Sequence, residues 1–390
     1  MSNILQELEA EIKKATASVS QENVGVIRSV GDGVAKIEGL SGVMLNEMIE
    51  FPGGVMGLAM NLEEHEVGAV ILGDDSKLKE GDTVKCSGRL LSVPVGRSLL
   101  GRVVNTLGEP IDGKPLDTTG ASWRSIEGPP PGPFERPIIT EMFSTGVRAI
   151  DSCMTMGCGQ RLGLFAGSGV GKSTLLGMIA RNSDADVNVV ALIGERGREV
   201  KEFVEDALGE KGMAKSVLVC STGDQPPLIR QKALLAATAV CEYFRDQGKK
   251  VFLMTDTVTR CAMAGREVGL SLGEPPTMKG YPPSIFSWLQ KVLERAGNSP
   301  KGSITALYTV LMEGDDISDP IVDIVRGIVD GHIFLSRKVA EMNHYPAIDV
   351  LGSISRLMSA IATPEHKSAA GKMRQLLALY RENKDLIDVG

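Results

Sequence analysis

The amino-acid sequence predicts an α/β protein in which a mostly parallel sheet covered by helices follows a small β-barrel and precedes a helical segment. After residue 150, apolar runs rich in β-branched residues alternate with helical stretches, a pattern typical of parallel strands joined by helices. Between residues 24 and 95, short strand-like runs are separated by glycine, aspartate and asparagine turns. From 364 to 383, apolar residues recur at helical spacing. With 390 residues, the chain is long enough for two or three domains.

The composition argues against several classes of function. A net charge of −7 has the wrong sign for a general binder of nucleic-acid backbones, and 4% aromatic residues offer little for base stacking, so we expect no nucleic-acid partner. No apolar run reaches the ~20 residues that span a bilayer, and the N-terminus lacks the apolar core of a signal peptide. These features predict a cytoplasmic protein, with peripheral association at the inner face of the membrane left open.

Cysteine and histidine usage does not indicate a transition-metal site. The six cysteines include no C-x-x-C pair, and the four histidines are scattered along the chain. We expect buried or free thiols in a reducing compartment.

The first predicted element is an N-terminal helical arm, residues 1–22. Apolar residues form one stripe of a helix expected over 2–18, with glutamate and lysine on the opposite side. A lone terminal helix of this length is marginally stable in water. It therefore either packs on its own domain or serves as a docking arm for a partner.

The β-barrel is predicted over residues 23–95. Its strand-like runs are 24–27, 33–37, 67–71 and 83–86. A proline-rich connector, residues 124–137, follows in the next domain and is not expected to be helical.

The central α/β domain is predicted over residues 96–362, and the start of a C-terminal helical domain over 363–390. Strands and helices should alternate through the central domain. The expected strands are 187–193, 216–220, 251–255 and 304–311, and the expected helices are 226–247 and 286–296.

A glycine-rich loop lies between a predicted strand, 162–165, and a predicted helix, 174–180. Glycines let successive backbone N–H groups turn inward, and the helix N-terminus adds a positive dipole, so such a loop suits a phosphate group. Lys172 would reach the β- and γ-phosphates, and the Ser173 hydroxyl would hold Mg²⁺. The residues expected to contact the nucleotide are Gly167, Ser168, Gly169, Val170, Gly171, Lys172, Ser173 and Thr174.

Ala166 stands where the usual phosphate-loop pattern G-x-x-x-x-G-K-[ST] has its first glycine. Alanine is tolerable there if the residue needs no positive φ, because its side chain is a single methyl group. The alternative interpretation is a glycine-rich strand–helix turn in another kind of α/β protein.

Three further residues offer what hydrolysis needs beyond a phosphate loop. Asp256 ends an apolar strand, which is how such folds place an acid beside Mg²⁺, although many strands end in aspartate. Glu195 ends another strand and is a candidate for polarising the attacking water; a surface ion pair with arginine is the alternative. Arg356 is a candidate arginine finger, the alternative being a solvated surface residue.

Together these segments resemble the rotary-type hexameric ATPases, whose core is a RecA-like P-loop domain. The resemblance extends over about residues 135–390 and is closest to the export ATPases of flagella and type III secretion, in which alanine before the glycine loop is ordinary. The matching motifs are GSGVGKST (167–174), GERGREV (194–200), STGDQPPLIR (221–230), TDTVTR (255–260), REVGLSLGEPPTMKGYPPSIF (266–286) and HYPAIDVLGSISR (344–356).

The front part resembles a different branch, the α subunit of F-type ATP synthase, which binds nucleotide without hydrolysing it. The segments that carry this likeness are 29–51, 57–74 and 93–115. Where that subunit has glutamine, this chain has Glu195, as catalytic members do. The resemblance therefore implies hydrolysis of ATP.

The resemblance implies a role for each matching residue, with ATP or ADP and Mg²⁺ as cofactors. Lys172 and Arg196 contact the γ-phosphate, and Glu195 activates water. Arg356 enters the site of the neighbouring subunit, where such fingers are worth ~10³–10⁵ in rate. Ser173 binds the metal, and Glu199 and Asp256 are acids near it. Arg260 is a basic group near the phosphates, and Tyr345 stacks on the adenine.

A chain that carries both the glutamate and the finger can build a homohexamer with composite sites. The implied partners are further copies, stalk, stator or export-apparatus proteins, and exported protein substrates. The chain stops at Gly390, where relatives continue with further helices, so the C-terminal domain is expected to be short and apparently truncated. The function predicted first is an ATPase that energises protein export. The alternatives are a subunit of a proton-translocating ATP synthase, or an ancestral or chimeric form of its core, and an RNA-translocating hexamer.

Overall fold

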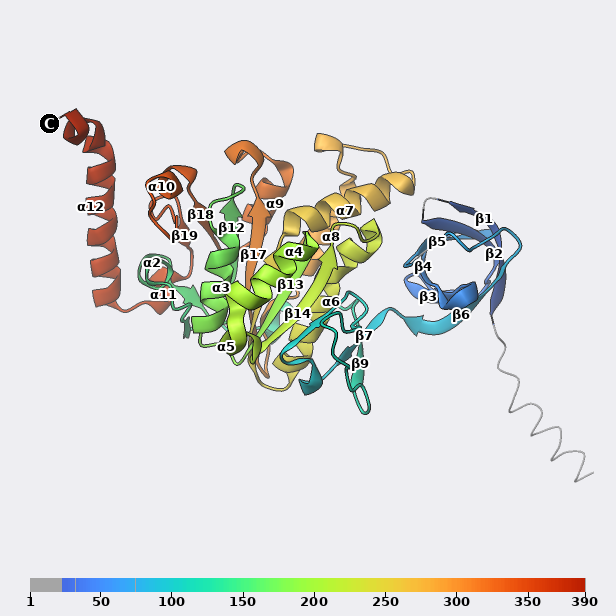
Figure 1. The fold of residues 1–390 in the computed structure, drawn as a ribbon. Helices are drawn as coiled ribbons and strands as arrows, with labels where there is room; N and C mark the ends of the chain where they lie inside the picture. The colour runs from blue at the N-terminus through green and yellow to red at the C-terminus, as the bar shows by residue number, and fades with distance from the viewer. Residues whose placement is uncertain (1–22, 32, 74, 390) are drawn as a thin grey trace, which may run out of the picture. The chain divides into compact units, whose positions relative to one another are not determined.

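The computed structural model describes residues 23–31, 33–73 and 75–389, apart from the side chains of residues 315, 388 and 389 (Figure 1). The chain divides into two compact units, the first ending at Leu91 and the second beginning at Ser92. The predicted arm over residues 1–22 lies outside the described residues. The predicted boundary after residue 95 lies beyond this division, because β7 (Ser92–Val95) belongs to the second unit, where it pairs with β9 (Ser122–Ser125).

The first unit contains a closed six-stranded barrel with the strand order β1-β2-β5-β4-β3-β6. Exposed and buried residues alternate along β1 and β2, so one face of each strand lines the barrel core, which includes Ile27, Ile37 and Ala69. The predicted barrel is confirmed. Its strands are β1 (Val24–Gly31), β2 (Val34–Gly39), β3 (Glu47–Glu50), β4 (Met56–Leu62), β5 (Glu66–Ile71) and β6 (Thr83–Leu90).

The second unit is built on a nine-stranded sheet with the order β19-β18-β12-β17-β15-β13-β14-β8, in which β16 also pairs with β17. The neighbours from β18 to β8 run parallel, and only the short strands β19 and β16 pair antiparallel. The predicted parallel sheet is therefore confirmed. Its strands are β8 (Arg102–Val104), β12 (Arg161–Ala166), β13 (Val187–Glu195), β14 (Ser216–Thr222), β15 (Lys250–Asp256), β16 (Gly297–Asn298), β17 (Ser303–Leu311), β18 (Gly331–Leu335) and β19 (Ile354–Ser355).

Helices cover this sheet, as the alternation of strand and helix predicts. The longest of them in the central part, α6 (Pro227–Asp246), packs on β13, β14 and β15. On another part of the sheet, α9 (Pro320–Ile328) packs against β12 and β17. The other helices of the second unit are α2 (Arg148–Cys153), α3 (Lys172–Asn182), α4 (Gly197–Glu202), η4 (Phe203–Leu208, a π-helix), α5 (Gly209–Met213), α7 (Val258–Ser271), α8 (Pro283–Leu293), α10 (Arg337–Glu341), α11 (Met358–Ile361) and α12 (Pro364–Val389).

The proline-rich connector needs one correction. Although it was predicted to be free of helix, it contains a single 3-10 turn, η3 (Pro133–Glu135). Proline suits the first turn of a helix, where its missing N–H needs no partner, so this short turn is compatible with the sequence. The turn does not propagate, because Pro137 follows closely.

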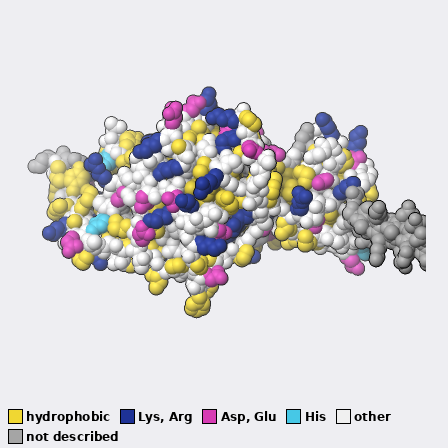
Figure 2. All heavy atoms as spheres, turned by 90° about the horizontal axis from the view of Figure 1, so that it is seen from below, with side chains coloured by type: hydrophobic (Ala, Val, Ile, Leu, Met, Phe, Trp, Pro, Cys, Tyr) yellow, Lys and Arg dark blue, Asp and Glu magenta, His cyan; other side chains and the backbone are white. Residues whose placement is uncertain are grey.

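Hydrogen bonds from Arg374 hold the C-terminal helix α12 against the rest of the second unit. The Arg374 guanidinium donates to the carbonyl oxygens of Val350, Leu351 and Ser353, at 2.7–3.2 Å. Along the rest of the helix, apolar side chains such as Leu376 and Leu386 are exposed, and Figure 2 shows apolar groups gathered at this end of the unit. None of the described helices combines the length and the apolar character needed to cross a bilayer.

Candidate active site

The glycine-rich loop connects the end of β12 to the start of α3. Gly169 and Gly171 adopt positive φ values of 79° and 87°, the left-handed region in which glycine is strongly favoured. Gly171 is the N-cap of α3 and makes no side-chain cap, so the helix N-terminus is open to a ligand.

Ala166 lies in β12, not in the turn. It is fully buried and pairs with Leu311 of β17 on one side and Leu335 of β18 on the other. Ala166 is not among the described residues that have positive φ. The condition under which alanine is tolerable at this position is therefore met.

Lys172, the first residue of α3, forms an ion pair with Asp256 through its Nζ and the carboxylate Oδ1. Asp256 is the last residue of β15 and is 2% exposed. This ion pair joins the phosphate loop to the carboxyl end of β15.

Glu195 ends β13, the strand beside β15, and is also buried. Its Oε1 lies 3.4 Å from Nη1 of Arg260, a residue of α7 that also donates to the Gly194 carbonyl oxygen. Burial, a hydrogen bond to Glu199 and the charge of Asp256 raise the pKa of Glu195 to about 7. The hydrogen bond from Glu195 lowers the pKa of Glu199. Glu195 therefore holds a proton more tightly than Glu199 does.

A cavity of about 870 Å³ brings most of the predicted site residues together. Arg198, Arg181 and Arg337 add positive charge to it, and Glu202 and Asp206 add negative charge. The predicted residues that line it are Gly167, Ser168, Gly169, Gly171, Lys172, Ser173, Thr174, Glu195, Arg196, Glu199 and Arg260. Val170 is 2% exposed and lies in the core beneath the loop, so its side chain does not line the cavity.

Besides Val170, the predicted residues Asp256, Tyr345 and Arg356 do not line this cavity. Tyr345 is 56% exposed, and its ring is next to the loop, since a Cβ added at Gly171 would be 3.5 Å from the tyrosine Cδ1. Arg356 follows β19, and its side chain is exposed while its backbone N–H donates to the Asp330 carbonyl at 3.0 Å. Within one chain, Arg356 does not line the cavity that contains Lys172.

Sequence reasoning missed several lining residues. Met312, Glu313 and Gly314 follow the end of β17, and Arg337 follows the end of β18. Because parallel strands end at the same edge of a sheet, an alignment of all strand ends could have indicated them. Arg181 and Asp206 carried no such signal, since they reach the cavity through the packing of α3 against η4.

The residues present suit Mg²⁺ bound together with phosphate. The described residues contain no cluster of three or more histidine, cysteine, aspartate or glutamate side chains suited to a metal ion. Mg²⁺ does not need one, because it keeps several waters and is held by one or two carboxylates and by substrate phosphates. Ser173 and Glu199 line the cavity, and the buried Asp256 pairs with Lys172, which also lines it.

Three family models match the chain. The nucleotide-binding domain of the ATP synthase alpha/beta family matches residues 146–355, and its beta-barrel domain matches residues 20–88. The C-terminal domain of the T3SS EscN ATPase matches residues 362–390.

Curated relatives and solved structures agree with this assignment. The chain is 54% identical to a flagellum-specific ATP synthase of Bacillus subtilis over 315 residues, which are 81% of this chain and 72% of the relative. It is 45% identical to the SPI-2 type 3 secretion system ATPase of Salmonella typhimurium over 367 residues, 91% of this chain and 84% of the relative. The assembled ATPase EscN of enteropathogenic E. coli superimposes with a TM-score of 0.87 at 46% identity, covering 94% of this chain and 89% of that one. EscN in complex with its central stalk EscO gives a TM-score of 0.86 at 45% identity, with 94% and 88% covered.

Proposed function

Because the chain belongs to the ATP synthase alpha/beta family, with flagellar and type III secretion ATPases among its relatives, we propose that it hydrolyses ATP to energise protein export. The observation that carries this proposal is the meeting of three strand ends. The phosphate loop after β12, Glu195 at the end of β13 and Asp256 at the end of β15 lie along one edge of the sheet. A role as a subunit of a proton-translocating ATP synthase is not favoured by these relatives.

The loop and Lys172 bind the β- and γ-phosphates in this proposal. The open N–H groups at the start of α3 and the lysine ammonium supply positive charge where the triphosphate is most negative. When bound, Mg²⁺ neutralises charge that develops on the phosphates. Ser173, Glu199 and Asp256 would hold it, and Lys172 would then be released from Asp256 to the phosphate.

Glu195 acts as the group that orients and activates the attacking water. Its raised pKa means that the carboxyl is partly protonated near neutral pH in the free protein, with Glu199 accepting its hydrogen bond. Arg260 beside it stabilises the ionised form that a base requires. Arg196 is largely exposed on the cavity wall and is free to approach a γ-phosphate once its weak contact to Glu199 opens.

Arg356 completes the site of a second copy. Its exposure outside its own cavity is compatible with a finger that acts in trans, and each chain carries both the finger and Glu195. The proposed assembly is therefore a homohexamer with equivalent composite sites. By analogy with the EscN complex, a stalk protein would be a partner, and Tyr345 beside the loop would stack on adenine.

Exported proteins are the proposed substrates, because relatives are named as type 3 secretion system ATPases. The proposed location is the cytoplasm.

The experiment is to measure ATP hydrolysis by the purified chain with and without Mg²⁺. Intrinsic Mg²⁺-dependent activity that is lost in Lys172→Ala supports the proposal. Activity that requires a second, different subunit would favour the synthase alternative, and activity that requires RNA would favour a translocase.

A further inference from the structure

Strand β19 positions the proposed Arg356 finger through its pairing with β18. His332 of β18 pairs with Ile354 of β19, and the backbone N–H of Arg356 continues this ladder by donating to the Asp330 carbonyl oxygen. Side chains along a strand alternate between the two faces of a sheet, so those of His332, Ile354 and Arg356 lie on the same face. In agreement, Ile354 and Arg356 are exposed while Ser355 between them is buried. His332 is therefore the diagonal neighbour of Arg356, at a spacing that long side chains can bridge.

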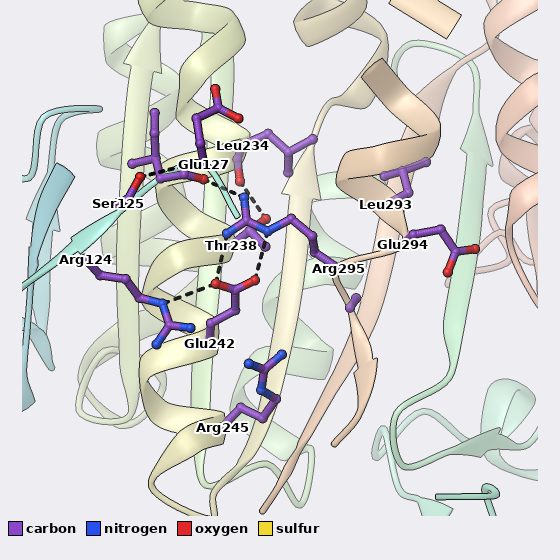
Figure 3. A network of polar contacts seen from close by, with 12 residues as sticks. Arg124, Ser125, Glu127, Leu234, Thr238, Glu242, Arg245, Leu293, Glu294 and Arg295 are labelled. Atoms are coloured by element: carbon purple, nitrogen blue, oxygen red, sulfur yellow. Dashed lines mark hydrogen bonds and ion pairs between the residues drawn. The ribbon is translucent and has the colours of Figure 1, made fainter. Parts of the chain in front are cut away.

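The guanidinium of Arg356 forms no ion pair with a carboxylate among the residues that the structure describes. Asp330, opposite Arg356 in the ladder, already accepts from the Arg161 backbone N–H at 3.1 Å and from Arg161 Nε at 3.3 Å. Arg295 shows the contrast, because Figure 3 places its guanidinium against Glu242, whose two oxygens accept from Nε and Nη2 at 2.8 and 2.9 Å. Such a two-point contact fixes the orientation of a guanidinium. The orientation of Arg356 therefore depends on the groups that pack beside it.

The ring of His332 belongs to a cluster of three rings on this face of the sheet. Its centroid lies 5.0 Å from that of Phe334 on the same strand and 6.4 Å from that of Phe165 on β12, both in edge-to-face arrangements. The two phenyl rings are 5.4 Å apart, and the Arg326 guanidinium of α9 lies 5.9 Å from the centroid of Phe334. We call Phe165, His332 and Phe334 the ring cluster. These contacts hold the imidazole in place beside Arg356.

The imidazole of His332 is neutral near pH 7. Burial lowers the pKa of His332 from its ordinary value of 6.5, and the positive charges of Arg326 and Arg356 lower it as well. A hydrogen bond to the Gly352 carbonyl oxygen acts in the opposite direction. The charges that act on the ring thus come from α9 and from the residue after β19. A neutral aromatic ring can pack against a guanidinium without repulsion between like charges.

We propose that His332 is a positioning residue for the Arg356 finger. Its ring supports the side chain of Arg356, so that the guanidinium points away from its own chain and toward the copy whose site it completes. The positive charge of Arg326 over Phe334 disfavours a conformation in which Arg356 folds back across the ring cluster. Orienting the finger before the reaction lowers the entropic cost of placing it at the γ-phosphate. This role rests on the proposed action of Arg356 in trans.

The first measurement is kcat and ATP affinity of the full chain carrying His332→Ala. We expect kcat to fall by about 10–100-fold, because a misplacement of about 1 Å can cost ~10²-fold in rate. ATP affinity should stay within about twofold of the parent, since His332 does not line the cavity that contains Lys172. His332→Phe keeps a flat, neutral ring beside Phe165 and should retain most of kcat. His65→Ala, at an exposed position between β4 and β5, is the matched control with unchanged kcat.

Mixing experiments then identify the half of the composite site to which His332 belongs. Arg356→Ala mixed with Glu195→Gln is the reference pair, which should regain activity. His332→Ala should likewise regain activity with Glu195→Gln but not with Arg356→Ala, because both of these variants impair the finger half. A general loss of structure would not produce this pattern. If His332→Ala proves unfolded by circular dichroism, His332→Gln replaces it, since glutamine keeps the size of the side chain and lacks the ring.

Several results would overturn the role of His332. These are an unchanged kcat in His332→Ala, activity regained by mixing it with Arg356→Ala, and activity regained with neither partner. When the reference pair regains activity, these results concern His332 alone and leave the finger in trans intact. When the reference pair stays inactive in verified mixed oligomers, the finger in trans is wrong and the role of His332 falls with it.

Discussion

At the scale of the single residue, the ammonium group of Lys172 has two competing partners. In the free protein its ammonium is paired with buried Asp256, and in the proposed complex it turns to the phosphates. We predict that Lys172→Ala lowers ATP affinity by two orders of magnitude or more, roughly the loss of a charged contact to phosphate. Equilibrium binding of a fluorescent ATP analogue checks this. Ordinary affinity in the variant would show that the loop is not the binding site.

Replacing the carboxyl group of Glu195 should leave ATP binding intact but lower the rate of turnover. Glu195→Gln keeps the size and the polarity of the side chain but loses the base, so we predict near-normal ATP affinity with kcat lowered by about 10²–10⁴. Steady-state kinetics together with direct binding measurements check both halves. An unchanged kcat would place the base elsewhere.

The raised pKa of Glu195 also predicts a pH dependence of stability in the nucleotide-free protein. Its ordinary value is 4.5 and its value in the fold is about 7, so the folded chain binds more protons than the unfolded chain between these values. The contribution of this residue is therefore fully present below about pH 4.5 and is lost as the pH rises through about 7.

The Glu195→Gln variant lacks the titrating carboxyl group and therefore lacks this pH-dependent loss of stability. Its free energy of unfolding should fall less between about pH 5 and about pH 8 than that of the parent chain. Urea unfolding at the two pH values measures it. Glu382→Gln, a change at an exposed position of α12, is the control and should follow the parent. Parallel curves for the parent and Glu195→Gln would contradict the prediction.

At the scale of the element, buried threonines continue the contact between β15 and β17 beyond their backbone ladder. The last paired residues are Thr255 and Tyr308. After them, Thr309 donates through its Oγ1 to the Thr255 carbonyl, and its N–H donates to Thr255 Oγ1 at 3.2 Å. These contacts fix the position of Thr255, the residue before Asp256, which ends β15.

Thr309→Val keeps the shape of the side chain but leaves the Thr255 carbonyl without its donor. We predict a loss of about 1–3 kcal/mol in the free energy of unfolding. Chemical denaturation is the measurement, and Thr118→Val at an exposed position is the matched control. A difference of less than a few tenths of a kcal/mol would mean that water replaces the bond.

Apolar runs predicted the strands well because a strand buried on both faces needs continuous apolar sequence. The run at 187–193 is contained in β13, and the run at 251–255 in β15. The shorter strands β8 and β19 were not predicted, because each lies at an edge of the sheet and is too brief to show a pattern. The 3-10 turn at Pro133 was missed since proline was read only as a helix breaker.

At the scale of the whole molecule, the position of Arg356 predicts complementation between copies. It lies outside its own cavity, so Arg356→Ala should lose turnover by about 10³ or more while retaining ATP binding. Mixing it with Glu195→Gln protein should restore some activity, because hybrid interfaces combine an intact finger with an intact glutamate. Mixed oligomers that are verified by native mass spectrometry and remain inactive would argue against a finger in trans.

The sequence alone determined the loop, its lysine, the acids at the strand ends and the class of fold, because each is encoded by neighbouring residues. Gly167 to Thr174 form a contiguous signal, and Asp256 and Glu195 are positioned by the strands that they end. Tertiary structure decided the rest: the ion pair of Lys172 with Asp256 and the raised pKa of Glu195. These depend on burial and on which distant segments meet, since dielectric and hydrogen-bond partners are set by the packed neighbours and not by the local sequence.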